Sequence, residues 1–228
     1  NITVKDNIID AYGTPAGSYG DRNAVSINYG GFPTNYRTAT GGVNNVVFTG
    51  NTVNGTGPAS YFRSGLSLDE GGGTMTGNTI TSINHDLLVR FAGNGPVTIS
   101  GNNCNGGGVE LSDQNAASGL ISVSGNTFTG AGAPGTAVLR IKNNYNSIVH
   151  NITNNNFNGY EWGISLENAN SINLDGNTFT TGSATAKAIV VNTKSISSNS
   201  NTIVQVPVAA SFLNNNFNGT GIGILFAN

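Results

Sequence analysis

The residues of this sequence best suited to chemistry are its charged side chains, which make up only 9% of the 228 residues. Several of these charges fall at matching positions of a short apolar segment that recurs along the chain. They are Asp69, Arg90, Glu110, Arg140, Lys142 and Glu167, with Asp113 just beyond the segment that contains Glu110. If the recurring segments lie side by side as strands, acids and bases meet on one sheet.

Ion pairing and glycan binding both suit such a charged sheet. Opposite charges on adjacent strands support strand register and contribute about 0.2–1 kcal/mol per pair. The neighbours expected to pair are Asp69–Arg90, Arg90–Glu110, Glu110–Arg140 and Lys142–Glu167. Aromatic rings stack on sugars, and loops beside a rigid scaffold often bind ligands. The glycan-binding candidates are Arg90, Asp113, Glu167, Tyr61, Tyr145 and Trp162.

Polysaccharide cleavage is the catalytic alternative. An inverting glycosidase needs two carboxylates about 6.5–9.5 Å apart, and Asp69 and Glu110 are the candidate pair. A lyase needs Arg or Lys as its base, for which Arg140 and Lys142 are the candidates. It also needs a neutralised uronate, often through Ca²⁺ held by several carboxylates. Outside that lyase role, the sequence predicts no cofactor.

Two recurring phrases predict the elements that position these residues. The first reads apolar, any, apolar, any, Gly, Asn, Thr, apolar, as in Ile121 to Phe128. Its asparagine recurs at Asn7, Asn51, Asn78, Asn102, Asn126, Asn155, Asn177 and Asn215. The shortest intervals, 22 to 24 residues, fit a coil of three short strands and three turns. The longer intervals from 7 to 51 and from 177 to 215 imply insertions.

The second phrase alternates apolar and other residues, as in Leu66-Ser67-Leu68 and Ile164-Ser165-Leu166. Alternation of period two marks strands with one buried face. The sequence therefore predicts one all-β domain over 1–228, a right-handed, single-stranded parallel β-helix with three sheets and about eight coils. Insertions are expected near 10–23, 28–44 and 192–210, and the last has room for another short coil around Asn201 to Ile203.

The Gly-Asn pair explains how the chain turns between strands. Glycine tolerates a positive φ and asparagine is the next most tolerant residue, so the pair allows a sharp bend. Coils stacked about 4.8 Å apart place each asparagine over the previous one. Their amides then form hydrogen bonds along the stack, which satisfies polar groups that are otherwise buried without partners.

Composition excludes several classes of protein. A net charge of −2 creates no field that attracts nucleic acid, and no apolar stretch is long enough to span a membrane. The single cysteine, Cys104, excludes an internal disulfide and occupies a core position of the repeat. His85 and His150 are too few and too far apart for a metal site, so none is expected.

With these residues in view, the chain resembles the pectin-lyase-like right-handed parallel β-helix superfamily over almost its whole length. The resemblance implies that the second phrase forms the sheet that carries the substrate cleft in polysaccharide-degrading members. Arg140-Ile141-Lys142 looks like the Arg-Ile-Lys motif of polygalacturonases, but the Asn-Thr-Asp, paired-Asp and Gly-His-Gly motifs of those enzymes are missing. The superfamily also contains lyases, phage spikes, adhesins and copper-maturation proteins, so the resemblance specifies the fold far more than the function.

The two ends of the sequence complete the prediction. Asn1 to Val4 enters directly into a strand and Ile222 to Phe226 runs out in one, with no polar cap at either end. We therefore expect head-to-tail assembly of copies or flanking domains of a longer chain. The predicted function is a secreted or cell-surface structural or adhesive module that contacts a polysaccharide or cell-surface glycan. A lyase or glycoside hydrolase acting on acidic polysaccharide is the alternative.

Overall fold

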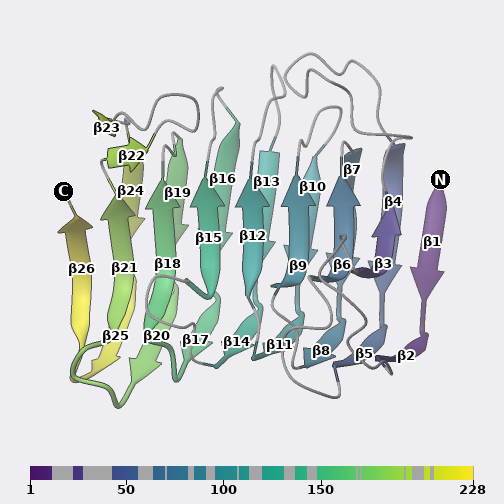
Figure 1. Ribbon diagram of the computed structural model, residues 1–228, viewed down its shortest axis with the longest axis horizontal. Helices are drawn as coiled ribbons and strands as arrows, with labels where there is room; N and C mark the ends of the chain where they lie inside the picture. Colours follow the sequence, from purple (N-terminus) through teal and green to yellow (C-terminus); the bar gives the residue numbers. More distant parts are fainter. Residues whose placement is uncertain are drawn as a thin grey trace.

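The chain forms a rod of stacked coils in the computed structural model, with its two termini at opposite ends of the rod (Figure 1). The structure describes residues 1–11, 23–27, 43–55, 64–69, 71–81, 85–90, 96–106, 108–112, 120–130, 137–142, 148–167, 169, 171–192, 194–196, 203–205 and 208–227. Within these ranges every regular element is a β-strand.

Three eight-stranded sheets run the length of the rod. Sheet A contains β1 (Ile2–Lys5), β4 (Val43–Thr49), β7 (Gly71–Thr76), β10 (Val97–Ser100), β13 (Leu120–Ser124), β16 (Val149–Thr153), β19 (Ile172–Asp175) and β24 (Ala210–Leu213). Sheet B contains β2 (Ile8–Ala11), β5 (Thr52–Gly55), β8 (Thr79–Thr81), β11 (Asn103–Asn105), β14 (Thr127–Thr129), β17 (Asn156–Asn158), β20 (Thr178–Thr181) and β25 (Asn216–Gly219). Sheet C contains β3 (Asn23–Ile27), β6 (Ser64–Asp69), β9 (His85–Arg90), β12 (Val109–Ser112), β15 (Leu139–Lys142), β18 (Trp162–Glu167), β21 (Lys187–Asn192) and β26 (Ile222–Ala227).

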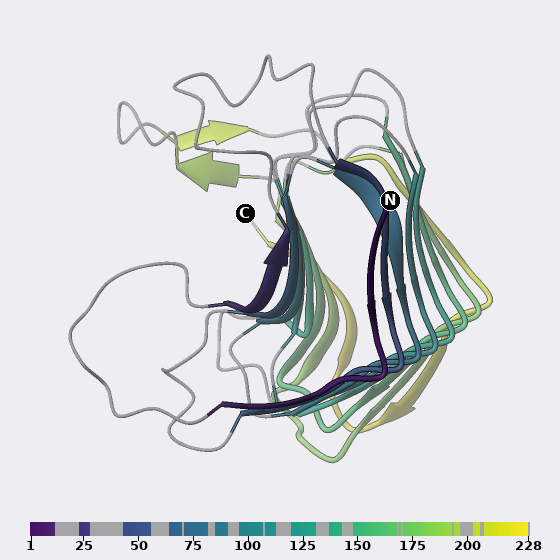
Figure 2. The same cartoon turned by 90° about the vertical axis from the view of Figure 1, so that its right-hand side faces the viewer.

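Each coil contributes one strand to each sheet, and strands stacked in these three sheets are parallel, as β10 and β13 illustrate. Parallel neighbours need a long crossover, which here consists of the other two strands of the coil. Seen from the N-terminal end, the chain turns clockwise as it recedes from the viewer, so the coil is right-handed (Figure 2). The predicted right-handed parallel β-helix of eight coils and three sheets is confirmed.

Alternate side chains of each strand fill the interior of the coil. In sheet B the inward position holds Phe128, Phe157 and Phe179, whose ring centroids are 5.1 and 4.8 Å apart along the stack. Cys104 lies in the same file, in register with Ile80 and Phe128, and is 1% exposed. The prediction of a buried core cysteine is therefore confirmed.

The turn between sheets A and B repeats the same backbone geometry in every coil. Gly50 and Gly77 have φ values of 64°, and Asn154 takes a φ of 55° at the same position. At Gly50 an added Cβ would also meet Oδ1 of Asp6 on the preceding coil, so the Asp6 side chain would have to move. The positive φ values confirm that the Gly-Asn pair makes this bend.

The asparagine after that position forms the predicted ladder. At Asn126, the backbone N–H and Nδ2 both donate to Oδ1 of Asn155, at 3.0 and 2.9 Å. Nδ2 also donates to the carbonyl oxygen of Ile99, at 3.0 Å. The same pattern links all eight predicted residues, Asn7, Asn51, Asn78, Asn102, Asn126, Asn155, Asn177 and Asn215.

The predicted insertions lie largely outside the described residues, at 12–22, 28–42, 197–202 and 206–207. The extra coil expected around Asn201 to Ile203 is wrong. β22 (Lys194–Ile196) and β23 (Ile203–Gln205) pair with each other as an antiparallel two-stranded sheet, whereas β19 pairs directly with β24. Closing a short loop between neighbouring strands costs little chain entropy, so the segment pairs locally instead of joining the stack.

Candidate functional site

Sheet C brings the predicted charged positions into two rows that alternate with the core rows. The first row is formed, strand by strand, by Ser26, Ser67, Leu88, Glu110, Arg140, Ser165 and Val190. The second row is formed by Asp69, Arg90, Ser112, Lys142, Glu167 and Asn192. The register expected from the alternation of apolar residues is therefore observed, and Asp69 lies opposite Arg90 as expected.

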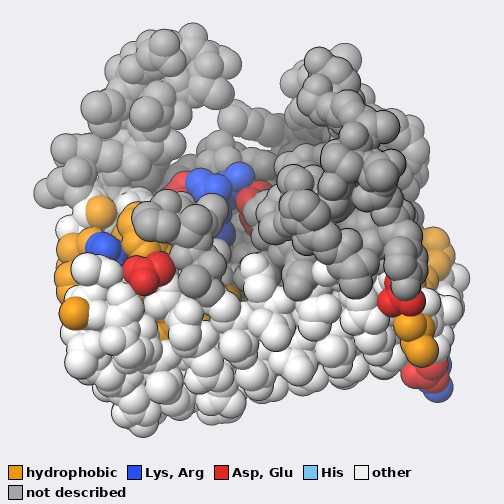
Figure 3. Space-filling view, turned by 60° about the horizontal axis from the view of Figure 1, so that its bottom comes forward, with side chains coloured by type: hydrophobic (Ala, Val, Ile, Leu, Met, Phe, Trp, Pro, Cys, Tyr) orange, Lys and Arg blue, Asp and Glu red, His pale blue; other side chains and the backbone are white. Residues whose placement is uncertain are grey.

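Two ion pairs join four of these residues in the middle of the sheet. Arg140 binds Glu167 with two hydrogen bonds, from Nε to Oε1 at 3.1 Å and from Nη2 to Oε2 at 2.9 Å. Lys142 Nζ lies 3.0 Å from Oε1 of Glu110. Acidic and basic side chains gather in the middle of the face shown in Figure 3.

The ion pairs run diagonally between strands. In register, Glu110 is opposite Arg140 and Lys142 is opposite Glu167, as the sequence predicted. The short contacts instead cross from β15 to the acid two positions along on each flanking strand, because long Arg and Lys side chains reach such diagonal neighbours. Arg90 is opposite Ser112, so the expected Arg90–Glu110 neighbours are also diagonal.

The side chains around Arg140 and Glu167 keep the guanidinium protonated and hold the carboxylate in place. Burial acts to lower the pKa of Arg140, but its hydrogen bonds to Glu167 and the charges of Glu167 and Glu110 outweigh burial and raise that pKa above its usual value. Ser165 Oγ donates to Oε1 of Glu167 at 3.2 Å and accepts a hydrogen bond from Asn192 Nδ2 at 3.0 Å. A guanidinium held this way stays protonated, which does not suit the general base of a lyase.

Burial differs along the two rows. Glu110 is 5% exposed, and Ser67, Ser112 and Ser165 are also buried. Arg140, Lys142 and Glu167 are partly exposed, with 24–32% of their side-chain surface accessible. The accessible part of the described cluster is therefore its Arg140–Glu167 pair together with Lys142.

Several candidates fall where the structure describes no side chain. Asp69 and Arg90 are placed only by the backbone of β6 and β9. Asp113, Tyr61 and Tyr145 lie outside the described residues. Their predicted roles in glycan binding, and the predicted Asp69–Glu110 carboxylate pair, remain predictions.

Trp162, a predicted glycan-binding residue, and Tyr160, two residues before it, differ in exposure. Trp162 is partly exposed, and Lys187 Nζ lies 5.6 Å from its ring centroid, a cation–π contact. Sequence reasoning missed Lys187, although the two residues are register partners on β18 and β21. Tyr160 is 3% exposed and packs edge-on against Phe179, so it belongs to the core.

His150 is buried inside sheet A, where burial lowers its pKa to about 4. It lies in register with Ile121 and Ile172, which makes it a core residue. Among the described residues, no three His, Cys, Asp or Glu side chains are grouped so that they could hold a metal ion. The described residues also contain no helix long and apolar enough to cross a membrane.

The two end coils form a second candidate surface. On the first coil, Ile2 is 39% and Ile8 is 76% exposed. The last coil exposes Leu213, Phe217, Ile222 and Phe226. Hydrophobic side chains gather at both ends of the rod in Figure 3. Each end also presents the outer edges of three strands, which can pair with further strands.

Comparison of the chain with protein-family models, with curated proteins and with solved structures finds no match.

Proposed function

We propose that this chain is a structural or adhesive β-helix module of a secreted or cell-surface protein. In this proposal its end coils associate with further β-helical coils, and the accessible part of sheet C contacts glycans. We also propose that the chain belongs to the pectin-lyase-like superfamily. The right-handed three-sheet coil and the asparagine ladder support that placement.

The observation that carries the proposal is the contrast between equivalent residues in interior and end coils. Phe179 is fully buried, whereas Phe217, its register partner on the last coil, is 42% exposed. Val191 is 3% exposed, whereas its partner Phe226 is 69% exposed. Exposed apolar groups beside open strand edges are typical of surfaces that bind other proteins.

The charge cluster supports a binding or structural role over catalysis. Its two bases, Arg140 and Lys142, each contact an acid, Glu167 and Glu110. The four charges neutralise one another, and Arg140 stays protonated because its pKa is raised. A polar, partly exposed cluster of this kind offers hydrogen bonds to sugar hydroxyls at its rim.

Electron microscopy tests the structural half of the proposal. Rods that lengthen in whole multiples of one chain as protein concentration rises would support end-coil association. Short rods of one fixed length at every concentration would contradict it.

Co-sedimentation with insoluble acidic and neutral polysaccharides tests the glycan half. The expected result is binding that weakens several-fold in Arg140→Gln, with Asn173→Gln, on the exposed face of sheet A, as the matched control. No binding to any polysaccharide would remove this half of the proposal.

The lyase or hydrolase alternative is tested by incubating the chain with the same polysaccharides and measuring reducing ends and unsaturated uronates. Products formed by the unmodified chain and not by Lys142→Gln would favour the enzyme over the binding module.

A further inference from the structure

We propose that the outward face of sheet B binds ice. The proposed function does not use this surface, so the two proposals are tested independently. The face consists of two files of side chains that run along the rod, one on each side of the buried core file of sheet B. Its composition, its spacing and its free hydrogen-bonding groups together match a ligand that is itself a regular array of water molecules.

The two files contain only threonine and asparagine from the second coil to the last. The first file holds Thr52, Thr79, Asn103, Thr127, Asn156, Thr178 and Asn216, and the second holds Asn54, Thr81, Asn105, Thr129, Asn158, Thr180 and Asn218. The first coil has Ile8 and Asp10 at these positions. From the third coil on, coils with two threonines alternate with coils with two asparagines, so the surface repeats every two coils.

The fold spaces these side chains evenly in two directions. Neighbouring strands of sheet B pair in register without a bulge, as Asn103 and Asn105 do with Thr127 and Thr129. Parallel strands lie about 4.7–4.9 Å apart, and residues two positions apart on one strand are about 6.6 Å apart. Both separations are close to distances at which water molecules repeat in planes of hexagonal ice. The hydroxyl and amide groups can therefore take the place of lattice waters over several coils.

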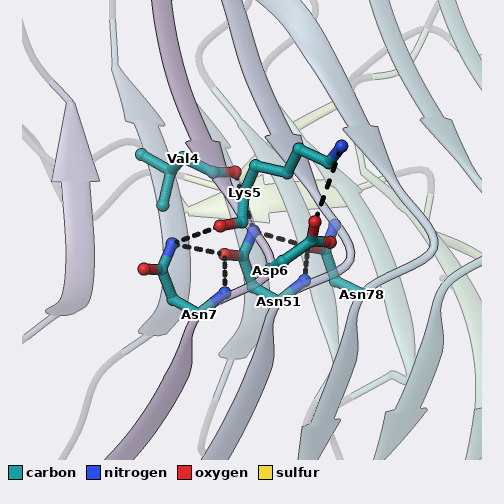
Figure 4. Close-up of polar contacts among 6 residues, drawn as sticks. All are labelled: Val4, Lys5, Asp6, Asn7, Asn51 and Asn78. Atoms are coloured by element: carbon teal, nitrogen blue, oxygen red, sulfur yellow. Dashed lines mark hydrogen bonds and ion pairs between the residues drawn. The ribbon is translucent and has the colours of Figure 1, made fainter.

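The asparagine ladder holds the first file in place. Each ladder asparagine directly precedes a residue of this file, and its carbonyl oxygen accepts the backbone N–H of the file residue on the next coil, as Asn51 does from Thr79 at 2.8 Å. Figure 4 shows the start of the ladder, where Nδ2 of Asn7 donates to Oδ1 of Asn51 at 3.0 Å. Between the two files, core residues such as Phe128 are fully buried. The surface is therefore ordered before it meets a ligand, which lowers the entropic cost of binding.

The polar groups of this face are left to bind water. Among the described residues, the only side-chain hydrogen bonds of the two files join Thr81 to Asn54, at 3.4 Å, and Asn54 to Asp10, at 2.9 Å. The side chains of the later coils are partly or fully exposed. A hydroxyl and an amide each donate and accept hydrogen bonds, as a water molecule does, and branching at Cβ restricts χ1 of threonine. The face thus presents oriented groups that can join a hydrogen-bonded lattice.

Other classes of ligand do not suit this face. From the second coil to the last, the two files contain no charge to bind nucleic acid, no aromatic ring to stack on a sugar and no large apolar side chain to anchor a protein. In Figure 3, the lower part of the view is formed by sheet B and has charged side chains only at the N-terminal end of the rod, on the right. The lack of charge favours ice, because a charge loses more hydration energy on leaving liquid water than a neutral hydroxyl or amide does.

Sheet A is the closest comparison, because its outward face is also polar. There the side chains bind one another: the hydroxyls of Thr76 and Ser100 lie 3.3 Å apart, and Nδ2 of Asn173 donates to Oδ1 of Asn151 at 2.9 Å. Its outward files mix serine, threonine and asparagine without a two-coil repeat, and Asp175 places a charge on the seventh coil. Sheet B, and not sheet A, is therefore the proposed ice-binding face.

Inhibition of ice recrystallisation tests the proposal. In annealed frozen sucrose solution, the unmodified chain is expected to keep ice grains small at concentrations where an inert protein of equal size does not. Thr127→Tyr places a ring in the middle of the face, so inhibition should require a several-fold higher concentration. Asn173→Tyr, on the exposed face of sheet A, is the matched control and should inhibit like the unmodified chain. Asn156→Tyr, at an exposed position of the same file, repeats the test if Thr127→Tyr changes the midpoint of urea unfolding.

Three results would overturn the proposal. Ice grains that grow as fast with the unmodified chain as with the inert protein mean that no surface of the chain binds ice. Inhibition that falls in Asn173→Tyr and persists in Thr127→Tyr and Asn156→Tyr assigns ice binding to sheet A instead. Co-sedimentation with crystalline cellulose or chitin that is lost in Thr127→Tyr, without any inhibition of recrystallisation, means that the face binds an ordered polysaccharide.

Discussion

Asn126 in a middle coil and Asn215 in the last coil occupy the same position of the same turn, yet their surroundings differ. Asn126 donates three hydrogen bonds to Asn155 and Ile99 and accepts two from Asn102. Asn215 has a coil on one side only, and its outward donors have no partner among the described residues. Their exposure differs in the same way, since Asn126 is buried and Asn215 is partly exposed.

The contrast shows that one repeating phrase produces two kinds of surface. In the interior, each coil satisfies the polar groups and covers the apolar groups of its neighbours. In the first and last coils, the same positions of the repeat are exposed, as Ile8 and Phe217 illustrate. In a solenoid each repeat contacts only its neighbours, and the first and last coils each stack on one coil of the described residues.

Replacing an asparagine in the middle of the ladder should reduce the free energy of unfolding more than any other change proposed below. Asn126→Leu removes the acceptor of two donors on Asn102 and the donors to Asn155 and Ile99. With each orphaned buried group costing about 1–3 kcal/mol, we expect a loss on the order of 4 kcal/mol or more. The midpoint of urea unfolding measures it. Asn7→Leu, at the first rung, is the control and should cost under about 1 kcal/mol, because Asn51 Oδ1 keeps its hydrogen bond from the backbone N–H of residue 7. Equal losses in both variants would contradict the contrast.

Lowering the pH should reduce the free energy of unfolding by slightly less than Asn126→Leu does. Burial holds the pKa of His150 at about 4, below the ordinary value of 6.5, so the folded chain binds fewer protons than the unfolded chain between these values. Above pH 6.5 this histidine does not reduce the free energy of unfolding. As the pH falls from 6.5 to about 4, the unfolded chain takes up the proton first, and the free energy of unfolding drops by on the order of 3 kcal/mol. Urea unfolding across this pH range measures the loss, and in His150→Leu that part of the pH dependence should disappear. A stability profile unchanged by His150→Leu would contradict the burial of this histidine.

Replacing glycine with alanine should reduce stability by different amounts at two turn positions. Gly77 and Gly176 both have a positive φ, so alanine strains the backbone of each by about 1–2 kcal/mol. An added Cβ at Gly77 meets nothing, whereas at Gly176 it meets Oδ1 of Asn154 on the preceding coil. Thermal unfolding should therefore show a larger loss in Gly176→Ala than in Gly77→Ala. Adding Asn154→Gly should bring the two losses together, and a difference that persists would contradict the proposed clash.

The smallest effect is expected at the accessible charge cluster. Arg140 and Glu167 are about 30% exposed, so solvent screens their interaction and a double-mutant cycle should give a coupling of about 1 kcal/mol or less. The cycle uses Arg140→Gln, Glu167→Gln and the double variant, with urea unfolding at low and high salt. Coupling that exceeds the effect of the ladder substitution would mean that sheet C, and not the ladder, is the main polar support of the rod.

Most of the fold follows from the sequence because the phrases that encode it are local and repeat. The Gly-Asn pair specifies a turn, and alternation of period two specifies which residues face inward. Together they located all eight ladder residues and the register of the charged rows. The local pairing of β22 with β23 was missed, since Lys194–Ile196 carries no signal that distinguishes a hairpin strand from a strand of the stack.

The side-chain geometry of the site was harder to predict. Register places Glu110 opposite Arg140, but side-chain length and neighbouring acids determine that Arg140 binds Glu167 instead. The burial of Glu110 and the contact of Lys187 with Trp162 likewise depend on packing around sheet C, which a strand pattern does not encode.

Sedimentation velocity over a wide range of protein concentration tests the central claim, that the end coils join, most directly. The account predicts that the sedimentation coefficient of the chain rises with concentration. It also predicts that Phe226→Lys, which places a charge on the open face of the last coil, keeps the value of a single rod because burying an unpaired charge is costly. A coefficient for the unmodified chain that stays constant at the single-rod value throughout the range would contradict the account.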